Sequence, residues 1–330
     1  MKSRRRQLVR IAAVLASVVF LFITAAASAA AAGAPDAPPL TIFLASTLSG
    51  YVRDLDRSLR ARDPGVALHA EGSGSLDAIR KVTDFHMPCD ILLSADWRLL
   101  DAPLAGVEPW VAVFAGNSMA LLYTSRSRYA NEITPDNWFR VLLRPGVRYG
   151  HSDPERDPEG YWTLIVWKLA ERYYNQPGLA AKLHARCPRS ATRPASVNLM
   201  ALLQAGELDY YFGYASDARL GNLKVLRLPD AINLSDFSRA TEYAKVSVEI
   251  GHGAHRKRVT GAPIAYGASM TAKPRNRKAA LEFLRLMFGA EGRRAAARNG
   301  LVPYQHVLAL DPKGAMPPAL KSLTTPFSPK

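Results

Sequence analysis

Apolar runs alternate with polar loops and helix-like segments along the first part of the chain. The runs with the length of buried strands are Leu40–Leu44, Val66–Ala70 and Asp90–Ser94. Between the first two, Tyr51–Arg62 carries Val52, Leu55 and Leu59 at helical spacing. A strand–loop–helix order repeated in this way predicts an α/β fold with a parallel sheet.

The later apolar segments predict further strands and helices. Residues 109–125 contain two strand-like pieces that carry the chain out of the first domain. Tyr161–Tyr174 has the pattern of a buried helix. Two closing helices, Arg277–Phe288 and Ala290–Asn299, precede what reads as a proline-rich tail beyond Leu301.

Two loops of small polar residues follow the first two predicted strands. Ser46 and Thr47 lie in the first loop, and Ser73 and Ser75 lie in the second. Ligands of open α/β sheets bind at the carboxyl ends of strands, where such loops offer hydroxyl donors and close backbone approach. The same residues also serve as ordinary helix caps and turns, and both interpretations stay open here.

An acid-rich loop precedes the helix predicted for Tyr161–Tyr174. Ser152, Asp153, Asp157 and Glu159 gather at this helix N-terminus. Unpaired backbone N–H groups and the helix dipole attract anions to such an end. Asp157 is therefore either a helix cap or part of a binding site.

The N-terminus has the layout of a secretory signal peptide, which we place at residues 1–32. Five positive charges precede an apolar run, and small residues with A-x-A spacing follow it. An uncleaved membrane anchor is the alternative. No cysteine lies near the cleavage region for lipid attachment, so we expect a protein released into the periplasm.

The full chain carries a formal charge of +15, of which the five N-terminal charges leave with the signal peptide. The remaining Lys and Arg are scattered and do not interleave with aromatic residues, which argues against a nucleic-acid partner. Basic charge also assists capture of a small anion. The two cysteines, Cys89 and Cys187, either form one disulfide in an oxidising compartment or remain free.

Seven sequence pieces together resemble one known family. They are IFLASTLSG, EGSGSLDAIRKVTD, DILLSAD, SDPERDPEGYWTLIVWKLAERYY, LLQAGELDYYFGYAS, LPDAINLSD and GAPIAYGASMTAK, in family order from Leu40 to about Val302. The chain resembles the tungstate/molybdate-binding proteins of ABC importers, a branch of the class II periplasmic binding proteins. The resemblance implies a monomer that binds an oxyanion without a cofactor and presents it to a permease of the inner membrane.

The resemblance also implies two α/β lobes joined by crossover hinge strands, with the ligand between the lobes. We place lobe I at residues 33–123 and lobe II at 124–262. Residues 263–330 then return to lobe I and add the C-terminal helices and tail.

The residues that match the family's ligand-binding positions come from five segments. They are Ser46 and Thr47, Ser73 and Ser75, Asp157 with Gly160 and Tyr161, Gly213, and Asn233 with Ser235. The first loop reads AST where the family more often has AGS, so Thr47 keeps the hydroxyl and adds a methyl group.

Gly213 marks a departure from the family pattern. Members that surround the metal of the oxyanion with six oxygens have a Glu in a Y-x-F-E-Y strand, whereas this strand reads YYFGY. Either Asp157 coordinates alone, another acid such as Asp153 replaces the Glu, or the ligand stays tetrahedral. We favour tetrahedral binding, because a carboxylate repels a bare anion unless it reaches the metal or is protonated.

Other kinds of function are alternatives to the transport of molybdate or tungstate. His252 and His255 suggest a divalent-metal site, but no acid or cysteine accompanies them in the sequence. An exported hydrolase lacks support, because neither a G-x-S-x-G nor an H-E-x-x-H motif is present. The fold with a different anion, such as sulfate, phosphate or an organic acid, and a sensor role both stay open.

Overall fold

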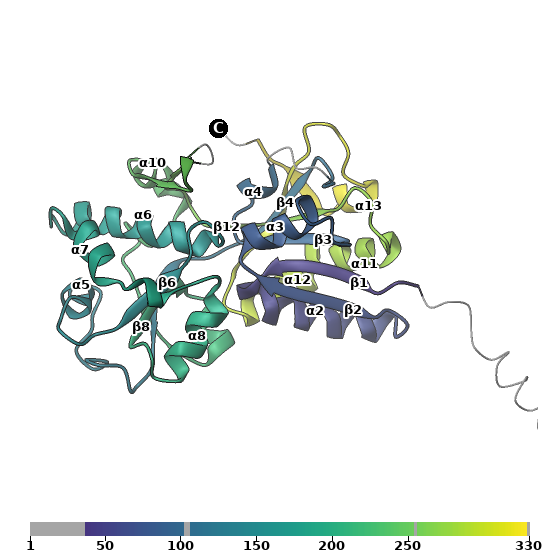
Figure 1. Cartoon of the computed structure of the whole chain (residues 1–330). Coiled ribbons are helices and arrows are strands. Elements are labelled where there is room, and N and C mark those ends of the chain that lie inside the picture. The colour runs from purple at the N-terminus through teal and green to yellow at the C-terminus, as the bar shows by residue number, and fades with distance from the viewer. Residues whose placement is uncertain (1–36, 102–105, 254–255, 329–330) are drawn as a thin grey trace, which may run out of the picture. The chain divides into compact units, whose positions relative to one another are not determined.

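A computed structural model describes residues 37–101, 106–253 and 256–328 (Figure 1). The predicted signal peptide lies outside the described residues. None of the described helices is long and apolar enough to cross a membrane. The described strands form two large sheets and one hairpin.

The first sheet has seven strands in the order β14-β13-β4-β12-β3-β1-β2. Their bounds are β1 Leu40–Ala45, β2 Leu68–Ser73, β3 Ile91–Ser94, β4 Val111–Gly116, β12 Ala265–Met270, β13 Val302–Leu310 and β14 Thr324–Pro326. β1 pairs in parallel with β2 and β3, which confirms the predicted parallel order of this part. β12 pairs antiparallel with β3 and β4, so the whole sheet is mixed.

Helices cover both faces of this sheet because the side chains of β1 alternate between two cores. Ile42 and Leu44 share a core with α2, α11 and α12, whereas Phe43 shares a core with α3 and α4. These helices are α2 Ser49–Arg62, α3 Ser75–Thr83, α4 Arg98–Asp101, α11 Arg277–Phe288 and α12 Ala290–Arg298. Each fully buried Leu or Phe contributes roughly 1.5–3 kcal/mol, which holds the loops at the ends of these strands in place.

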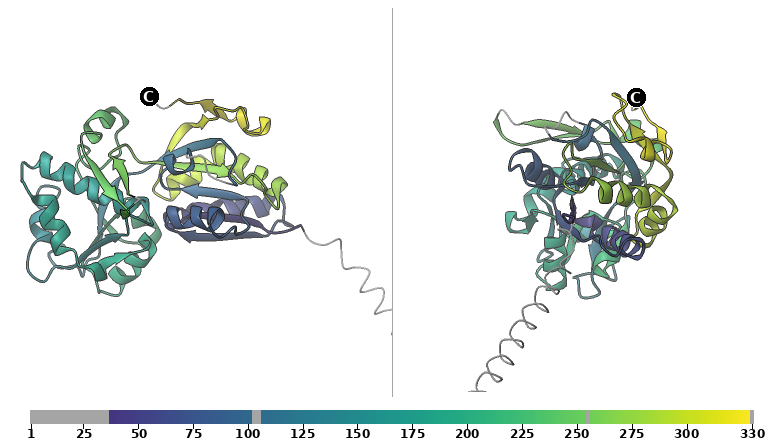
Figure 2. Two further views of the ribbon diagram at one scale, coloured as in Figure 1. Left: turned by 45° about the horizontal axis from the view of Figure 1, so that its top comes forward. Right: turned by 90° about the vertical axis from the view of Figure 1, so that its right-hand side faces the viewer.

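The segment beyond Leu301 is not the proline-rich tail that the sequence suggests. β13 pairs with β4, β14 pairs in parallel with β13, and α13 (Pro318–Lys321) connects the two strands. Figure 2 shows this yellow segment beside the strands of the first sheet. Pro326 ends an edge strand and Pro303 lies at a shift of register, and both positions tolerate a missing N–H.

The second sheet has five strands in the order β7-β6-β8-β5-β9. Its elements are β5 Met119–Tyr123, α5 Trp138–Leu142, β6 Tyr149–Ser152, α6 Pro158–Tyr173, α7 Leu179–Arg186, β7 Thr192–Arg193, α8 Ser196–Gln204, β8 Tyr210–Tyr214, α9 Asp217–Gly221 and β9 Lys224–Arg227. Leu121 and Phe212 share a core with α6, whereas Leu122 and Tyr211 share a core with α8. This sheet is therefore also covered on both faces.

Short elements complete the described chain. They are the 3-10 turns η1 Ser46–Leu48, η2 Arg189–Ala191 and η3 Phe237–Arg239, the helix α10 Ala240–Tyr243, and the antiparallel hairpin of β10 Ser247–Ile250 with β11 Lys257–Thr260. Both cysteines are free, so of the two alternatives left open by the sequence the structure has the unpaired thiols.

The chain first crosses between the sheets earlier than the predicted boundary at 123–124. β5 already belongs to the second sheet, so the crossing lies at Asn117 and Ser118. β4 and β5 are equally apolar, and composition therefore does not mark the change of sheet. The crossing is fixed by backbone bonds: the Met119 N–H donates to the Asn233 carbonyl and the Ile264 N–H donates to the Leu234 carbonyl, each at 2.8 Å.

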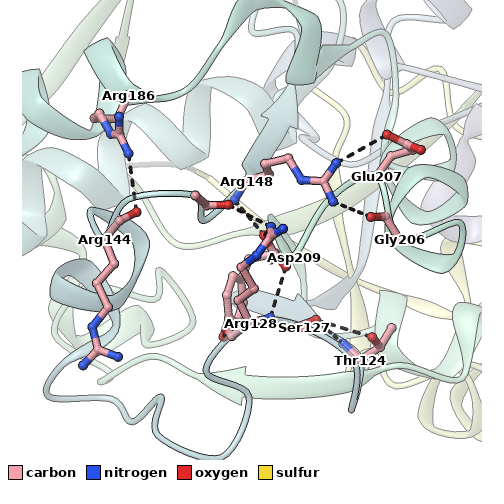
Figure 3. Close-up of polar contacts among 11 residues, drawn as sticks. Thr124, Ser127, Arg128, Arg144, Arg148, Arg186, Gly206, Glu207 and Asp209 are labelled. Carbon is pink, nitrogen blue, oxygen red and sulfur yellow. Dashed lines mark hydrogen bonds and ion pairs between the residues drawn. The ribbon is translucent and has the colours of Figure 1, made fainter.

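A buried aspartate anchors the long loop after β5. Asp209 accepts hydrogen bonds from the backbone N–H groups of Arg128 and Arg148 and from the Arg128 guanidinium at 2.9 Å (Figure 3). The Arg148 guanidinium in turn donates to Gly206 and Glu207. A buried carboxylate requires hydrogen-bond donors in place of water, so these bonds stabilise the fold of the loop.

Candidate functional site

Hydroxyl groups of the first loop face hydroxyl groups of the second sheet. Ser46 and Thr47 are both buried after β1. The Ser46 Oγ lies 3.2 Å from the Oγ of Ser196, the first residue of α8. The Thr47 Oγ1 lies 3.1 Å from the Oγ of Ser216, the residue that precedes α9. The two sheets thus meet through neutral donors at helix N-termini.

The second loop contacts the acid-rich loop through its backbone. A Cβ on Gly74 would lie 2.2 Å from the carbonyl oxygen of Arg156, so only glycine permits this approach. The Leu76 N–H donates to the same carbonyl at 3.1 Å. Ser75 is buried and accepts from the Ala95 N–H at 3.0 Å, whereas the half-buried Ser73 donates to the Gly74 carbonyl. Ser75 therefore supports the end of β3.

Asp157 is the N-cap of α6, with Pro158 as the first helical residue. Its carboxylate accepts from the Glu159 N–H at 3.1 Å, which is the capping geometry considered from the sequence. Asp157 is only 4% exposed. Burial, and next the charge of Asp217, raise the pKa of Asp157 to about 7. A capping aspartate that is exposed at the surface would not have its pKa raised in this way.

Gly160 and Tyr161 follow on the first turn of α6. A Cβ at Gly160 would lie 2.3 Å from the Ser152 carbonyl, so glycine permits the loop to fold back on the helix. The buried Tyr161 hydroxyl donates to Asp96 of the first sheet at 2.8 Å. The Arg98 guanidinium donates to the same oxygen of Asp96 at 2.7 Å and to its other oxygen at 3.0 Å, and it lies over the Trp162 ring. Tyr161 therefore joins the two sheets.

Two buried acids beside Asp157 were not among the residues predicted for the site. Glu159 and Asp217 are both 0% exposed. Asp217 accepts from the Thr47 hydroxyl at 2.7 Å and from the Tyr211 hydroxyl at 3.3 Å. Burial raises the pKa of Asp217 to about 6, and burial followed by the charges of Asp217 and Asp157 raises the pKa of Glu159 well above its ordinary value.

Gly213 lies beside the Asp217 carboxylate. A Cβ at Gly213 would lie 3.1 Å from the Asp217 Oδ2 and 2.5 Å from the Tyr211 ring. A side chain at 213 therefore has no room, and Asp217 places a carboxylate next to this position. Asp153, the replacement considered from the sequence, is half-buried and accepts from the Glu155 N–H.

Asn233 and Ser235 do not join these residues through their side chains in the described contacts. Asn233 donates to the Leu228 carbonyl and to Asp230, and its Oδ1 accepts from the Ser235 N–H at 2.9 Å. They fix the turn at the second crossing between the sheets. The described side-chain contacts of Asn233 are all within its own turn.

The histidines considered for a metal site do not extend the candidate site. The His252 side chain is 91% exposed and contacts Glu155 at 3.1 Å. His255 lies outside the described residues. Across the part of the chain that is described, no group of three His, Cys, Asp or Glu side chains could hold a metal ion.

A family model for bacterial extracellular solute-binding proteins matches residues 40–302. The chain belongs to this family. Family membership confirms the prediction of a solute-binding protein rather than an enzyme, and it places the protein outside the cytoplasm.

Relatives of this solute-binding protein cover most of its length. An uncharacterised solute-binding protein of Petrotoga mobilis is 38% identical over 264 residues, which are 79% of this chain and 82% of the relative. The molybdate/tungstate-binding protein WtpA of Thermococcus kodakarensis is 35% identical and covers 79% of this chain and 80% of its own. That of Pyrococcus abyssi is 36% identical, with 71% and 74% covered.

Solved structures confirm the predicted periplasmic binding protein fold. The periplasmic molybdate-binding protein of Azotobacter vinelandii matches with a TM-score of 0.57 at 17% identity, over 81% of this chain and 100% of its own. The sulfate-binding protein SubI of Mycobacterium tuberculosis matches with a TM-score of 0.55 at 16% identity, over 81% and 87%.

Sequence reasoning missed Ser196, Ser216, Glu159 and Asp217 as members of the site. Glu159 stands out as an acid in a loop rich in acids, but nothing in the chain order links it to Asp217. One usable signal is the position of Asp217, four residues after the glycine that breaks the family pattern. An acidic residue this close to the position where the family has its Glu is a candidate to replace the missing carboxylate.

Proposed function

We propose that this solute-binding protein captures a tetrahedral oxyanion, molybdate or tungstate, between the loops of its two sheets and delivers it to an ABC permease. The observation that carries the proposal is the meeting of Ser46 with Ser196 and of Thr47 with Ser216 at helix N-termini. In the periplasm, where we place the protein, a monomer would bind the anion and dock on the inner-membrane permease.

The chemistry of these groups suits a desolvated anion. A dianion that leaves water loses strong hydration, so several hydrogen-bond donors must replace it. Neutral hydroxyl and N–H groups at helix ends form charge-assisted hydrogen bonds with it and need no cation. An anion between the loops would take over the hydroxyls of Ser46, Thr47, Ser196 and Ser216, which contact one another or Asp217 in the described structure.

A cavity beside the site offers a basic approach for the anion. It has a volume of about 260 Å³ and is lined in part by Asp96, Tyr161, Arg98, Lys257 and Arg258. Three of these five side chains are cationic, and a basic wall raises the local concentration of an anion. The names of the relatives from Thermococcus kodakarensis and Pyrococcus abyssi support molybdate and tungstate as the first ligands to test.

Titration calorimetry with molybdate, tungstate, sulfate and phosphate tests the proposal. We expect molybdate and tungstate to bind at least about tenfold more tightly than sulfate, because the donors suit any tetrahedral anion and cavity size must discriminate. Tight binding of sulfate or phosphate alone would transfer the function to that anion. Absence of heat with all four would reject an oxyanion-binding function.

A pair of serine variants tests the location of the site. Ser196→Ala removes a hydroxyl that faces Ser46 and should weaken anion binding about tenfold, the value of one hydrogen bond. Ser58→Ala is the matched control, since its hydroxyl contacts the Asp54 carbonyl and Glu291 and none of the residues assigned to the site. Equal affinities of the two variants would place the anion elsewhere.

A further inference from the structure

Three buried carboxyl groups of the site have no cationic partner among the described residues. Asp157, Glu159 and Asp217 are at most 4% exposed, and none of them forms a described ion pair. Arg98 and Arg156, which lie on segments that contact this site, are paired with Asp96 and Asp77. Ionised carboxylates in such surroundings are strongly unfavourable, and a bound dianion would add further repulsion.

One oxygen of Glu159 has no hydrogen-bond partner. Its Oε2 accepts from the Tyr214 N–H at 3.3 Å, whereas its Oε1 is buried and unpaired in the described structure. A carboxylic acid has an O–H that requires an acceptor. The Asp217 carboxyl lies within hydrogen-bond reach of Glu159 and is one such acceptor. The oxygen of a bound anion is another, so a protonated Glu159 and an oxyanion complement each other where an ionised Glu159 and an oxyanion do not.

We propose that Glu159 and Asp217 hydrogen-bond the captured anion as neutral carboxylic acids, and that anion capture is coupled to proton uptake by those acids of the cluster that are still ionised in the unliganded protein. This inference rests on the proposed function. Each captured proton comes from solvent and forms an O–H bond on a carboxylate oxygen, and it returns to solvent when the anion leaves. The site therefore binds a dianion without any cation of its own.

Burial favours the neutral form of both acids, whereas the hydroxyls of Thr47 and Tyr211 beside Asp217 and the Tyr214 N–H beside Glu159 favour the ionised form. Burial acts first on Glu159 and Asp217, and no positive charge offsets it. The titratable groups that face the cluster are Asp157 and Tyr161 of α6, Tyr211 and Tyr214 of β8, Tyr266 of β12 and Asp77 of α3. The four tyrosines have raised pKa values and stay neutral, so they supply no charge.

Calorimetry of tungstate binding in pairs of buffers with different ionisation enthalpies measures the protons taken up. We expect about one proton or more per anion near neutral pH, and an affinity that falls about tenfold per pH unit for each proton as the pH rises. This measurement of proton uptake requires only the wild-type protein. Binding without proton uptake would overturn the inference and leave the proposed function intact, whereas no binding of any oxyanion would overturn both.

Neutral amide variants identify the groups that carry the protons. Glu159→Gln and Asp217→Asn keep an uncharged donor, so we expect tungstate binding with less proton uptake and a flatter pH dependence. Asp136→Asn, an exposed acid, is the charge-matched control and should behave like the wild type. Loss of binding at every pH in a folded Glu159→Gln protein, together with six oxygens around tungsten by X-ray absorption, would show ionised carboxylates and overturn the inference.

Thermal unfolding of the unliganded protein gives a second, ligand-free test. A carboxyl whose folded-state pKa exceeds its unfolded value stabilises most below the unfolded pKa of about 4. That contribution is lost as the pH rises through the folded pKa values, about 6 for Asp217 and about 7 for Asp157. We expect the wild-type midpoint to fall over this window and the Glu159→Gln midpoint to fall less. A wild-type midpoint that rises or stays constant would contradict the inference.

Discussion

At the scale of single residues, Thr47 occupies the most informative position of the site. Its hydroxyl donates to Asp217 at 2.7 Å and lies 3.1 Å from Ser216, so one side chain reaches both groups of the second sheet. The methyl group that distinguishes Thr from the family's usual Ser does not prevent these contacts. Thr47 is thus a hydroxyl donor already directed at an oxygen acceptor.

Replacing Thr47 by Val removes the hydroxyl and preserves the shape of the side chain. We expect Thr47→Val to weaken tungstate binding about tenfold, the value of one hydrogen bond, when measured by calorimetry. Thr41→Val is the control, because the Thr41 hydroxyl reaches only the Pro39 carbonyl at 3.5 Å. An affinity of Thr47→Val equal to that of the control would remove Thr47 from the site.

Asp157 combines capping with a place in the acid cluster, and two substitutions separate these roles. Asp157→Ala loses the cap and should lower the free energy of unfolding by about 1 kcal/mol. Asp157→Asn keeps a capping oxygen and a neutral group, so we expect near wild-type stability and tungstate affinity. Denaturant unfolding and calorimetry measure both. A stable Asp157→Asn protein that fails to bind would show that the ionised carboxylate is needed.

At the scale of elements, α6 begins at Pro158, three residues before the start at Tyr161 that its apolar pattern predicts. Asp157 caps the helix, Pro158 occupies the first helical position, and Gly160 lets the preceding loop pack on the first turn. The C-terminal strands are elements that the sequence pattern does not predict. Their prolines suggest a tail, but β13 and β14 pair at one edge of the first sheet, where a missing N–H is tolerated.

The end of the described chain is held by Phe327. Its ring packs edge-on against Trp97 at 5.5 Å, and its N–H donates to the Ala309 carbonyl at 2.8 Å. We expect Phe327→Ala to lower the free energy of unfolding by about 1 kcal/mol, since an aromatic pair is worth about 0.5–1.5 kcal/mol beyond its buried area. Phe85→Ala, at a ring 72% exposed, is the control, and an equal effect of both would refute this role.

At the scale of the whole described molecule, a few polar contacts join the loops of the two sheets. Tyr161 donates to Asp96, Arg156 pairs with Asp77 at 2.7 Å, and the Leu76 N–H donates to the Arg156 carbonyl. These contacts involve residues next to the loops that we propose to bind the anion. Closure of the protein on a ligand would therefore depend on them as well as on the anion.

Removing the Tyr161 hydroxyl weakens this joining contact without leaving Asp96 alone, because Arg98 still holds it. We expect Tyr161→Phe to reduce tungstate affinity about fivefold to tenfold, the value of one buried hydrogen bond, with little change in the unfolding midpoint. Tyr173→Phe on the same helix is the control, since its side chain is 49% exposed. Calorimetry compares the two, and small-angle scattering with and without tungstate reports closure.

Much of the fold could be predicted from the chain alone. The periodicity of Leu40–Ser94 indicates three parallel strands with intervening helices, and the structure has them. The position of the first crossing and the edge strands β13 and β14 could not be predicted. In both cases the local sequence pattern fits more than one arrangement of the segment. Pairing with strands that are distant in the sequence determines which arrangement forms.

The amino-acid sequence by itself determined most of the local elements and the family to which the chain belongs, and it marked Asp157 as a candidate helix cap. Short-range periodicity and capping chemistry suffice for such features. Only the tertiary structure decided that Thr47 reaches Asp217, 170 residues away, and that Asp217 lies beside Gly213. The protonation of the buried acids is also decided only by the tertiary structure, because a pKa depends on burial and on neighbours that folding brings together.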